Sequence, residues 1–315
     1  MTKYENHFKY ESFEYEPTDR QSHKQMKPRK TKANGRFYPD DIHEMDDGIE
    51  SWVPTYVRNL DPKHHEREWV INSLGHFYRD NIVSDVTRLV KGGKEANVYC
   101  CTGHENSGEA LIAAKLYRPR MLRSLKNDAI YKIGRTAVDE GGQAIRNRRE
   151  RVAIQKKTRF GKRLDFDQWI GTEFRVLEEL YEAGAAVPKP IGYHNTTLLM
   201  SFIGDEYGSA PTLSEVSIER EEANPLFNAL LEDVSIMLNH GYVHGDLSAY
   251  NILYWEGELT LIDFPQMVNA HKNPHAYKLF ERDISRVCDY FSRFGITHHV
   301  KALARSLWHE HMEEE

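Results

Sequence analysis

Hydrophobic and polar residues recur with several different periods along this 315-residue chain, and each period predicts a different kind of element. Residues 1–48 have no sustained period and a mixed polar and charged composition, which predicts a largely disordered or extended segment. In residues 49–82, Trp69, Leu74 and Phe77 recur at helical spacing, which predicts a helical extension. The packed fold is therefore expected to begin after residue 48.

Segments of strand type follow and predict a small sheet. The stretch "VTRLVKGGKEANVYCCTG" contains two β-type runs around paired glycines, and "GEALIAAKLYRP" predicts a third strand. "PKPIGYHNTTLLMSFIG" predicts two further strands joined by a His-Asn turn. A helix at about 167–183, with apolar residues from Trp169 to Tyr181 on one side, comes between them. We therefore expect a sheet-rich lobe over residues 83–203, with a long basic flexible loop at about 119–165.

Residues 204–315 are predicted to form a mainly helical lobe. Short strand-type runs occur around Asn251–Trp255 and Leu259–Ile262, and the other apolar residues recur at helical spacing. The chain has no internal repeat, so a solenoid is not predicted. Strands, one helix, more strands and then mostly helices together predict an α+β fold with two lobes, the first small and β-rich and the second helical.

The charge of the chain limits the classes of partner. The formal net charge is −6 at pH 7, which argues against a protein that coats nucleic acid through its overall charge. A local exception lies around residues 144–163, since "RNRRERVAIQKKTRFGKRLD" carries nine Lys and Arg against one Glu and one Asp. This basic loop is expected either to contact RNA or a ribosomal subunit, or to be a mobile solvated loop.

Cysteine usage and apolar run lengths indicate a compartment. The three cysteines form no Cys-x-x-Cys pair, so neither a disulfide framework nor a zinc site is predicted. The opening stretch "MTKYENHFKYESFEYEPTDR" lacks the apolar core of a signal peptide, and no apolar run is long enough to span a bilayer. We expect free thiols in a cytoplasmic protein without membrane contact.

The glycine turn in "VKGGKEANVY" is the first candidate for binding chemistry. Gly92 and Gly93 have no Cβ, so the backbone amides of this turn can approach a phosphate closely, and Lys94 adds positive charge. Paired glycines between strands also occur in ordinary hairpins. The turn by itself leaves both interpretations open.

The apolar strand "LIAAKLY" contains Lys115, and a buried ammonium group needs an anionic partner. Protein kinases hold the nucleotide phosphates with a third-strand lysine and pair that lysine with a glutamate on a helix. Glu173, on the helix expected at 167–183, is the best candidate for this partner. A position at the sheet edge, with the ammonium of Lys115 in solvent, is the alternative.

The stretch "HGDLSAYN" matches the H-x-D-x-x-x-x-N catalytic loop of kinases, in which the aspartate orients the acceptor hydroxyl and the asparagine holds magnesium. These positions are Asp246 and Asn251. In "LTLIDFPQ", Asp263 follows a short strand, where the metal-binding aspartate of the DFG element belongs. Carboxylate and amide oxygens suit Mg²⁺, whereas His244 is expected to be structural. Together the motifs predict a kinase-like phosphoryl-transfer site.

Three motifs point to one family, since "GKEANVY", "HGDLSAYN" and "IDFPQMV" together resemble the RIO family of atypical serine/threonine protein kinases. The resemblance runs from about Val86 to Phe294. It mixes two subfamilies, because "GGKEANVY" looks like the first and "NPHAYKLFERD" like the second, and a prokaryotic RIO-like kinase fits this mixture. The N-terminal residues do not show the winged-helix pattern of the second subfamily.

The resemblance implies a two-lobed protein-kinase-like fold without an activation segment. It implies ATP as a ligand, together with Mg²⁺ or Mn²⁺. Asp246, Lys115 and Asp263 would be catalytic, and Asn251 would bind the metal together with Asp263.

The same resemblance implies roles for supporting residues. Glu173 and Asp283 would be structural, the first as the partner of Lys115 and the second as a brace of the catalytic loop. The turn would cover the phosphates, the backbone of Ser201 and Ile203 would meet the adenine, and Met200 would lie behind it. The expected nucleotide-binding residues are Val90, Gly92, Gly93, Lys94, Glu95, Ala96, Asn97, Val98, Lys115, Met200, Ser201 and Ile203.

By resemblance, the activity would be that of a non-specific serine/threonine protein kinase, an ATPase, or both. Phosphoryl transfer from ATP would go to serine, including serines of the chain itself, or to its own Asp263, in ribosome or ribonucleoprotein maturation. Two alternatives stay open. One is a small-molecule phosphotransferase of the aminoglycoside or choline type, which shares the HGDxxxxN loop, and the other is a non-enzymatic nucleotide-sensing, RNA-binding assembly factor. The sequence does not identify the protein substrate.

Overall fold

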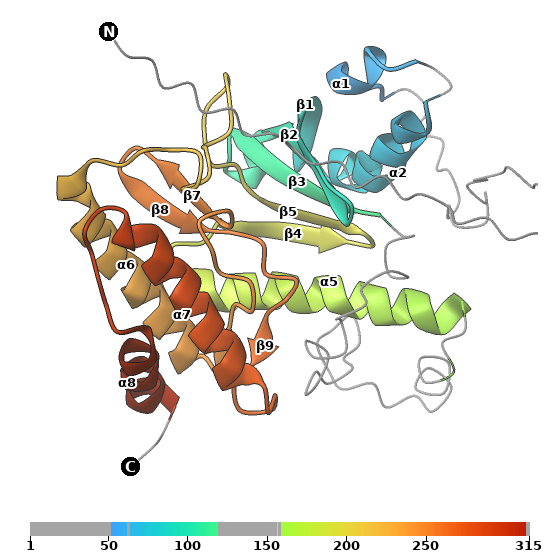
Figure 1. The fold of residues 1–315 in the computed structure, drawn as a ribbon. Coiled ribbons are helices and arrows are strands. Elements are labelled where there is room, and N and C mark those ends of the chain that lie inside the picture. Colours follow the sequence, from blue (N-terminus) through green and yellow to red (C-terminus); the bar gives the residue numbers. More distant parts are fainter. Residues whose placement is uncertain (1–51, 62–63, 119–155, 157–158, 313–315) are drawn as a thin grey trace, which may run out of the picture. The chain divides into compact units, whose positions relative to one another are not determined.

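A five-stranded sheet forms the first lobe of the computed structural model, which describes residues 52–61, 64–118, 156 and 159–312 (Figure 1). The strand order is β1-β2-β3-β5-β4, so β3 is central, and each neighbouring pair is antiparallel. A short 3-10 helix, Glu105–Ser107, lies between β2 and β3. The strand bounds are β1 Val83–Gly92, β2 Ala96–Gly103, β3 Leu111–Tyr117, β4 Pro190–His194 and β5 Thr197–Ser201.

The two hairpins predicted from turn residues are confirmed. Gly92 pairs with Asn97 at the end of the β1–β2 hairpin, and His194 pairs with Thr197 across the β4–β5 turn. Asn195 in the second turn has a φ of 49°, in the left-handed region that asparagine tolerates better than most residues. Local turn chemistry is therefore enough to pair strands that are adjacent in the sequence.

The central strand β3 is covered on both of its faces. Because side chains alternate along a strand, Ile112, Ala114 and Leu116 share one face. They pack in a hydrophobic cluster with α1 (Thr55–Arg58) and α2 (His65–Arg79), the two helices of the N-terminal extension. This cluster buries one side of the sheet before the chain reaches α5.

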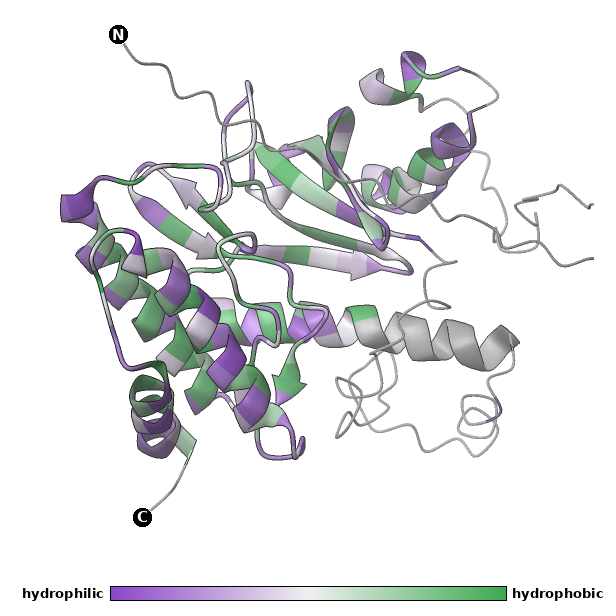
Figure 2. Cartoon of the chain, in the orientation of Figure 1, coloured by the Kyte–Doolittle hydropathy of each residue, from purple (hydrophilic) through white to green (hydrophobic). Residues whose placement is uncertain are grey.

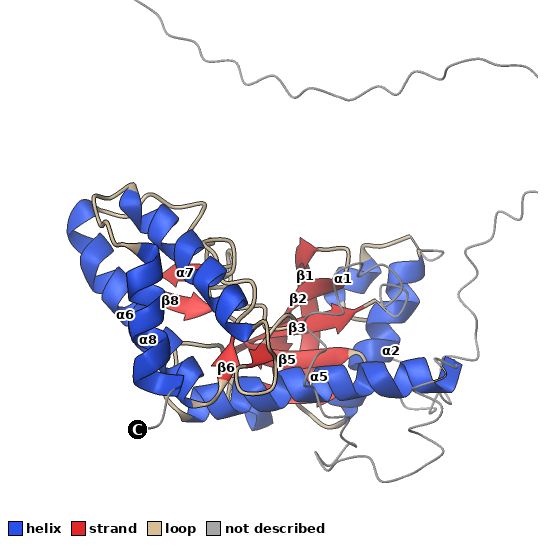
Figure 3. Ribbon diagram, turned by 60° about the horizontal axis from the view of Figure 1, so that its bottom comes forward, coloured by secondary structure: helices blue, strands red, loops and turns tan. Residues whose placement is uncertain are grey.

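The opposite face of β3 carries Lys115 and Tyr117 and meets α5 (Arg159–Glu182), the long helix in Figures 1 and 3. Buried positions on α5 recur every three or four residues, which is the spacing of one helix face. They include Ile170, Glu173, Val176, Leu177 and Leu180. Glu173 therefore occupies a position on α5 where a hydrophobic side chain is the rule.

The start of α5 corrects the predicted loop boundary. The helix begins at Arg159, earlier than the predicted residue 167 and inside the loop expected at about 119–165. Lysine and arginine favour helix almost as well as leucine, so a dense run of positive charge does not end a helix. Tyr181 is exposed although it was predicted on the apolar side, and the side chain of Trp169 lies outside the described residues.

Helices and short strands form the second lobe (Figure 3). The two strands predicted around residues 251–255 and 259–262 are present, whereas the short strands at residues 242–243 and 268–269 were not predicted. Strand β6 pairs with β9, and β7 pairs with β8. Figure 2 shows that the helices of this lobe carry both hydrophobic and hydrophilic residues along their length, as expected where one helix face is buried. The bounds are α6 Arg220–Asn239, β6 Tyr242–Val243, β7 Ile252–Trp255, β8 Glu258–Leu261, β9 Val268–Asn269, α7 Ala276–Ser292 and α8 Val300–Met312.

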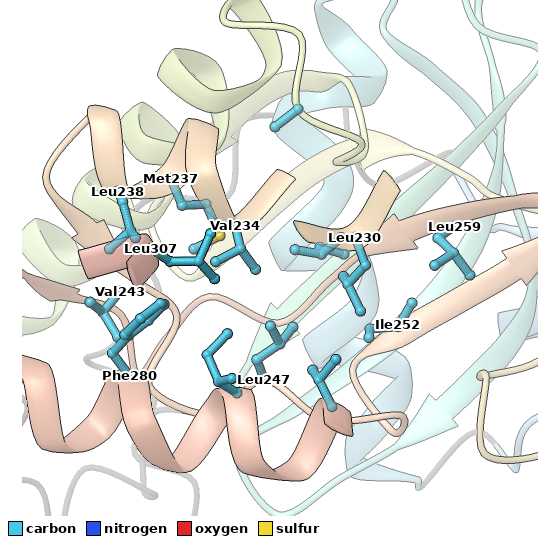
Figure 4. Close-up of a cluster of buried hydrophobic side chains, with 14 of the residues drawn as sticks. Leu230, Val234, Met237, Leu238, Val243, Leu247, Ile252, Leu259, Phe280 and Leu307 are labelled. Atoms are coloured by element: carbon cyan, nitrogen blue, oxygen red, sulfur yellow. The ribbon is translucent and has the colours of Figure 1, made fainter. Parts of the chain in front are cut away.

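The core of the second lobe also takes in part of α5. Val176, Leu177 and Leu180 from the C-terminal half of that helix belong to the same cluster as the side chains of α6, α7 and α8. Since α5 also packs on the sheet, it joins the cores of the two lobes. The residues labelled in Figure 4 are Leu230, Val234, Met237, Leu238, Val243, Leu247, Ile252, Leu259, Phe280 and Leu307.

The segment after α5 is fixed to the second lobe through its backbone. The amide of Ala186 donates to Oδ1 of Asp233 on α6 at 2.8 Å, and the carbonyl of Ala186 accepts from the amide of Leu261 on β8 at 2.7 Å. A buried backbone group without a partner costs about as much free energy as a lost hydrogen bond. These two bonds therefore fix the place where the chain leaves α5 for β4.

The order of elements confirms the predicted α+β fold with a β-rich first lobe and a helical second lobe. Within the ranges that the structure describes, no helix is both long and apolar enough to cross a membrane. Residues 1–48, which the sequence predicts to be disordered or extended, lie outside the described residues, as does most of the basic segment 144–163.

Asp233 leads to a prediction about stability and pH. Burial, with Glu232 nearby, raises the pKa of Asp233 to about 6 despite the bond from Ala186. Folded Asp233 therefore binds a proton more tightly than the unfolded chain, in which an aspartate titrates near 4. Its contribution to the free energy of unfolding is fully present below about pH 4 and is lost as the pH rises through about 6. We expect Asp233→Asn, which keeps the acceptor oxygen, to gain stability over the wild type across this range, by up to about 3 kcal/mol.

Calorimetric melting of the wild type and the variant between about pH 4 and pH 7 measures this difference. Asp289 on α7 is exposed, so Asp289→Asn serves as the control and is expected to follow the wild type at every pH. Parallel curves of Tm against pH for the wild type and Asp233→Asn would contradict the assignment.

Candidate functional site

Lys115 is the centre of a cluster of ion pairs. Its Nζ lies 3.0 Å from Oε1 of Glu173 on α5 and 2.7 Å from Oδ1 of Asp263, which follows β8. Lys115 is 9% exposed. Burial favours the neutral amine, but the carboxylates of Asp263 and Glu173 outweigh it and raise the pKa of Lys115 well above its usual range. One ammonium group thus connects the sheet, α5 and the second lobe.

Glu173 has a second partner, Tyr117, whose hydroxyl donates to Oε2. Tyr117 comes two residues after Lys115 on β3, so both side chains lie on the same face of the strand. Burial and the carboxylate of Glu173 raise the pKa of Tyr117 well above its usual range, so the phenol remains a donor. The sequence analysis missed Tyr117, although its place two positions from a buried lysine in the same strand was an available signal.

Asp263 has an unusual backbone conformation. Its φ is 73°, in the left-handed region that residues other than glycine rarely adopt. Such strain persists only where the surrounding structure holds it, and it is common at functional sites. Burial raises the pKa of the carboxyl group, but the charge and hydrogen bond of Lys115 outweigh burial and lower it, so Asp263 is ionised. Its side chain is 46% exposed, which leaves the carboxylate accessible to a ligand.

The loop "HGDLSAYN" lies beside Asp263. The amide of Ile262 donates to the carbonyl of Asn251 at 3.0 Å, and Nε2 of His244 lies 3.2 Å from the carbonyl of Ile262. Nδ1 of His244 accepts from the amide of Asp246 at 3.3 Å, so Nε2 carries the hydrogen. Burial lowers the pKa of His244, which keeps the ring neutral. His244 therefore holds the loop in place, the structural role that the sequence predicts.

Asn251 and Asp263 carry the oxygen atoms that could hold a divalent cation. Nδ2 of Asn251 donates to the carbonyl of Asp246 at 2.9 Å and to its Oδ2 at 3.3 Å, and this orientation leaves Oδ1 of Asn251 as an acceptor. Asp263 uses Oδ1 for Lys115 and has a second carboxylate oxygen. Two hard oxygen donors fit Mg²⁺, which completes its octahedral shell with phosphate and water oxygens.

Helix α7 braces the loop "HGDLSAYN". Oδ2 of Asp283 accepts from the amide of Gly245 at 2.7 Å, and Arg282 donates to the carbonyl of Gly245. Gly245 has a φ of 80°, a conformation that glycine adopts without strain. Burial raises the pKa of Asp283 to about 6, although Arg282 and the amides of Gly245 and Leu247 oppose this shift. Asp283 thus contacts the loop as the resemblance implies, whereas Arg282 was not identified from the sequence.

The carboxylate of Asp246 also has a partner that the sequence analysis missed. Nη1 of Arg286 on α7 donates to Oδ1 of Asp246 at 2.7 Å. Arg286 comes three residues after Asp283, so both lie on the same side of the helix. This spacing within "ERDISRVCDYF" was the available signal, but it says nothing about which loop atom each side chain meets.

The glycine turn has a backbone that requires glycine at one position and a buried side chain at another. A Cβ at Gly93 would lie 2.8 Å from the carbonyl oxygen of Ala96, so this position needs glycine. The side chain of Asn97 is buried, donates to the hydroxyl of Tyr99 at 3.0 Å and accepts from Arg118 at 2.7 Å. The Asn97 side chain is therefore used inside the lobe, and its backbone is the part that borders the turn.

The other expected nucleotide-binding residues of β1, β2 and the turn are exposed or half-buried: Val90, Gly92, Lys94, Glu95, Ala96 and Val98. Met200 on β5 packs against hydrophobic clusters of both lobes. The amide of Ser201 donates to the carbonyl of Lys189 at 2.8 Å, and the carbonyl of Ile203 accepts from the amide of Ala210 at 2.9 Å. These bonds do not use the Ser201 carbonyl or the Ile203 amide, the two groups that could meet an adenine.

Comparison with known proteins gives the family. Residues 97–303, more than half of the chain, match the family model described as the RIO domain. The chain belongs to the RIO family. The resemblance carried by the three motifs is thereby confirmed. The match to the RIO model begins at Asn97, so the residues of the glycine turn that precede Asn97 lie outside it.

Curated relatives carry the RIO name. The serine/threonine-protein kinase RIO1 of Chaetomium thermophilum is 32% identical over 247 residues, which are 74% of this chain and 43% of the relative. The RIO-type serine/threonine-protein kinase Rio1 of Thermoplasma acidophilum is 34% identical over 151 residues, which are 46% of this chain and 78% of the relative. The chain thus spans less than half the length of the fungal RIO protein.

A solved RIO structure has the same fold. The Rio2 kinase of Chaetomium thermophilum, in an ADP/Mg²⁺-phosphoaspartate complex, is similar with a TM-score of 0.51 and 22% sequence identity. The similarity covers 76% of this chain and 66% of that chain. The kinase-like RIO fold, with an antiparallel sheet in the first lobe and helices in the second, is therefore confirmed.

The bond from Tyr117 to Glu173 leads to a prediction about this RIO chain. Tyr117→Phe removes a donor from a buried carboxylate, and we expect the free energy of unfolding to fall by about 1–3 kcal/mol. Urea unfolding measures the change. Tyr207 is 86% exposed, so Tyr207→Phe is the control and should change stability by less than about 0.5 kcal/mol. Equal stabilities of the two variants would contradict a structural role for the Tyr117 hydroxyl.

Proposed function

We propose that this chain is an ATP- and Mg²⁺-dependent RIO-type atypical protein serine kinase and ATPase. It transfers the γ-phosphoryl group of ATP to serine, including its own serines, or to its own aspartate. The observation that carries the proposal is the cluster of Lys115, Glu173 and Asp263 beside the loop with Asp246 and Asn251. A fixed cation, two oxygen ligands for a metal and a carboxylate near the acceptor are what phosphoryl transfer from a nucleotide needs.

The contacts of Lys115 support its proposed role at the phosphates. Its ammonium keeps its bond to Glu173, which Tyr117 also holds, and exchanges its bond to Asp263 for phosphate oxygens when ATP binds. Asp263 and Asn251 are then the proposed ligands of Mg²⁺, or of Mn²⁺ in its place. The metal would neutralise charge on the phosphates as the transferred group leaves.

The proposed nucleotide contacts use mostly backbone. The turn Gly92–Asn97 covers the phosphates with its amides, because glycine allows close approach. The Ser201 carbonyl and the Ile203 amide meet the adenine, and Met200 closes the back of the site. The burial of the Asn97 side chain supports a contact through its backbone at that position.

Asp246 is the proposed carboxylate on the acceptor side. It orients a serine hydroxyl for in-line attack and accepts the proton of that hydroxyl. Its contact with Asn251, a proposed metal ligand, supports a position next to the transferred phosphoryl group.

Transfer to an aspartate is the proposed second outcome. The Rio2 structure from Chaetomium thermophilum is described as an ADP/Mg²⁺-phosphoaspartate complex. We infer that Asp263 is the aspartate that accepts the phosphoryl group here. Its accessible carboxylate forms an ion pair with Lys115, the residue proposed to hold the phosphates. Hydrolysis of that acyl phosphate would make the chain an ATPase switch acting on a ribonucleoprotein partner.

The two alternative functions have less support. The small-molecule phosphotransferase is disfavoured by the RIO family match and by relatives named as protein kinases. The non-enzymatic assembly factor is disfavoured because the chain has all four residues that the transfer would need, and hydrogen bonds and an ion pair bring them together. These residues are Lys115, Asp246, Asn251 and Asp263.

The proposal is tested with the purified chain, Mg²⁺ and ATP labelled on the γ-phosphate. We expect label on the protein, and Lys115→Ala should reduce labelling by about 10²-fold or more because phosphate positioning is lost. Label that is lost at alkaline pH or to hydroxylamine, and is absent in Asp263→Asn, is the acyl phosphate. Alkali-stable label is phosphoserine.

Lys189 forms an ion pair with Glu109, so Lys189→Ala is the matched control and should label like the wild type. A wild-type chain that neither takes up label nor hydrolyses ATP would overturn the proposed function.

We also propose that the basic segment 144–163 contacts RNA, such as that of a small ribosomal subunit. The support is the excess of Lys and Arg in this segment. Binding through phosphate contacts weakens steeply with salt, and the slope falls as basic residues are removed. We expect a variant with Arg146, Arg148, Arg149 and Arg151 changed to Gln to bind a ribosomal RNA fragment with a smaller salt slope. An unchanged slope between about 50 and 200 mM salt would contradict the contact.

A further inference from the structure

The carboxylate of Asp246 is held unequally by its two neighbours. Its Oδ1 accepts from Nη1 of Arg286 at 2.7 Å, the distance of a charge-assisted hydrogen bond. Its Oδ2 accepts from Nδ2 of Asn251 at 3.3 Å, which is long for such a bond. Arg286 therefore limits rotation of the carboxylate about the Cβ–Cγ bond, and Oδ2 is the oxygen that an acceptor hydroxyl can take.

Arg286 can hold this carboxylate because its helix is fixed at the same place. Val287, the next residue on α7, is buried in the core of the second lobe, and Asp283 accepts from the amide of Gly245 at 2.7 Å. Asp283 and Arg286 lie three residues apart on one side of α7. One helix thus holds the backbone of Gly245 and the side chain of Asp246, two consecutive loop residues.

Stability does not explain the pair between Arg286 and Asp246. The two side chains are 39% and 33% exposed, and ion pairs in such positions usually contribute less than about 1 kcal/mol. The bonds from Asp283 and Arg282 to Gly245 already attach α7 to the loop. What Arg286 adds is a fixed direction for the Asp246 carboxylate.

We propose that Arg286 is a positioning residue for phosphoryl transfer that acts through Asp246, an inference that rests on the proposed function. By holding Oδ1, Arg286 directs Oδ2 of Asp246 toward the acceptor serine. In the transfer step the hydroxyl proton passes to Oδ2 and a bond forms between the serine oxygen and the γ-phosphorus. The bond from the γ-phosphorus to the β–γ bridging oxygen breaks, and its electron pair leaves with ADP. A misdirected carboxylate slows this step and leaves ATP binding intact.

The rate of alkali-stable labelling of the chain's own serines, measured with Mg²⁺ at a series of ATP concentrations, tests this role and gives kcat and the KM for ATP for transfer to serine. We expect Arg286→Ala to lower kcat about ten- to hundredfold while the KM for ATP stays within about twofold of the wild type. Arg286→Lys, which can keep one charge-assisted bond to Oδ1, is expected to restore part of kcat. In an Asp246→Asn background, Arg286→Ala should have little further effect, because its action passes through the carboxylate.

Arg305 is exposed on α8, so Arg305→Ala serves as the control. It removes the same positive charge from the surface and is expected to leave kcat unchanged. Thermal melting shows whether Arg286→Ala is folded, and Arg286→Gln replaces it in the same assays if it is not. The positioning role would be overturned by an unchanged kcat in Arg286→Ala. It would also be overturned if Arg286→Ala lowered kcat by the same factor in the wild-type and the Asp246→Asn backgrounds. Neither result would contradict the proposed function. A wild-type chain without turnover would overturn the proposed function, and the role of Arg286 with it.

Discussion

A single buried ammonium group, Nζ of Lys115, connects parts of the chain that are far apart in sequence. It lies on the central strand of the sheet and contacts Glu173, 58 residues later, and Asp263, 148 residues later. Lys115 and Glu173 are buried, so each would be costly without the other. The sheet, α5 and the loop after β8 are therefore constrained to the arrangement in which these three charges meet.

The candidate site depends on two anchors that approach it from different lobes. Lys115 holds Asp263 from the first lobe, and α7 holds the loop "HGDLSAYN" from the second. The loop and Asp263 are joined by the bond between Ile262 and Asn251 and by the contact of Asn251 with Asp246. The side chains that would bind a metal, hold phosphates and orient an acceptor are thus brought together by contacts within the chain itself.

The parts of the site that were predicted have a local cause. Asp246 and Asn251 lie five positions apart in one loop, and their match to the H-x-D-x-x-x-x-N loop of kinases suggests metal and acceptor chemistry. Glu173 was found because a lysine in an apolar strand needs a carboxylate. Tyr117 and Arg286 were not found, because their partners lie 56 and 40 residues away and the local spacing of each residue does not specify which atom its side chain meets.

The sequence by itself determined the hairpins, the order of strands and helices and the RIO family, because turn residues, apolar spacing and motif letters act over a few neighbouring positions. Only the tertiary structure decided that the Asn97 side chain turns inward to meet Arg118, which follows β3, and that Arg286 on α7 reaches Asp246 in the loop. Each of these depends on distances between atoms on different elements. Such distances are set by how whole elements pack together, which residue types and their spacing along the chain do not specify.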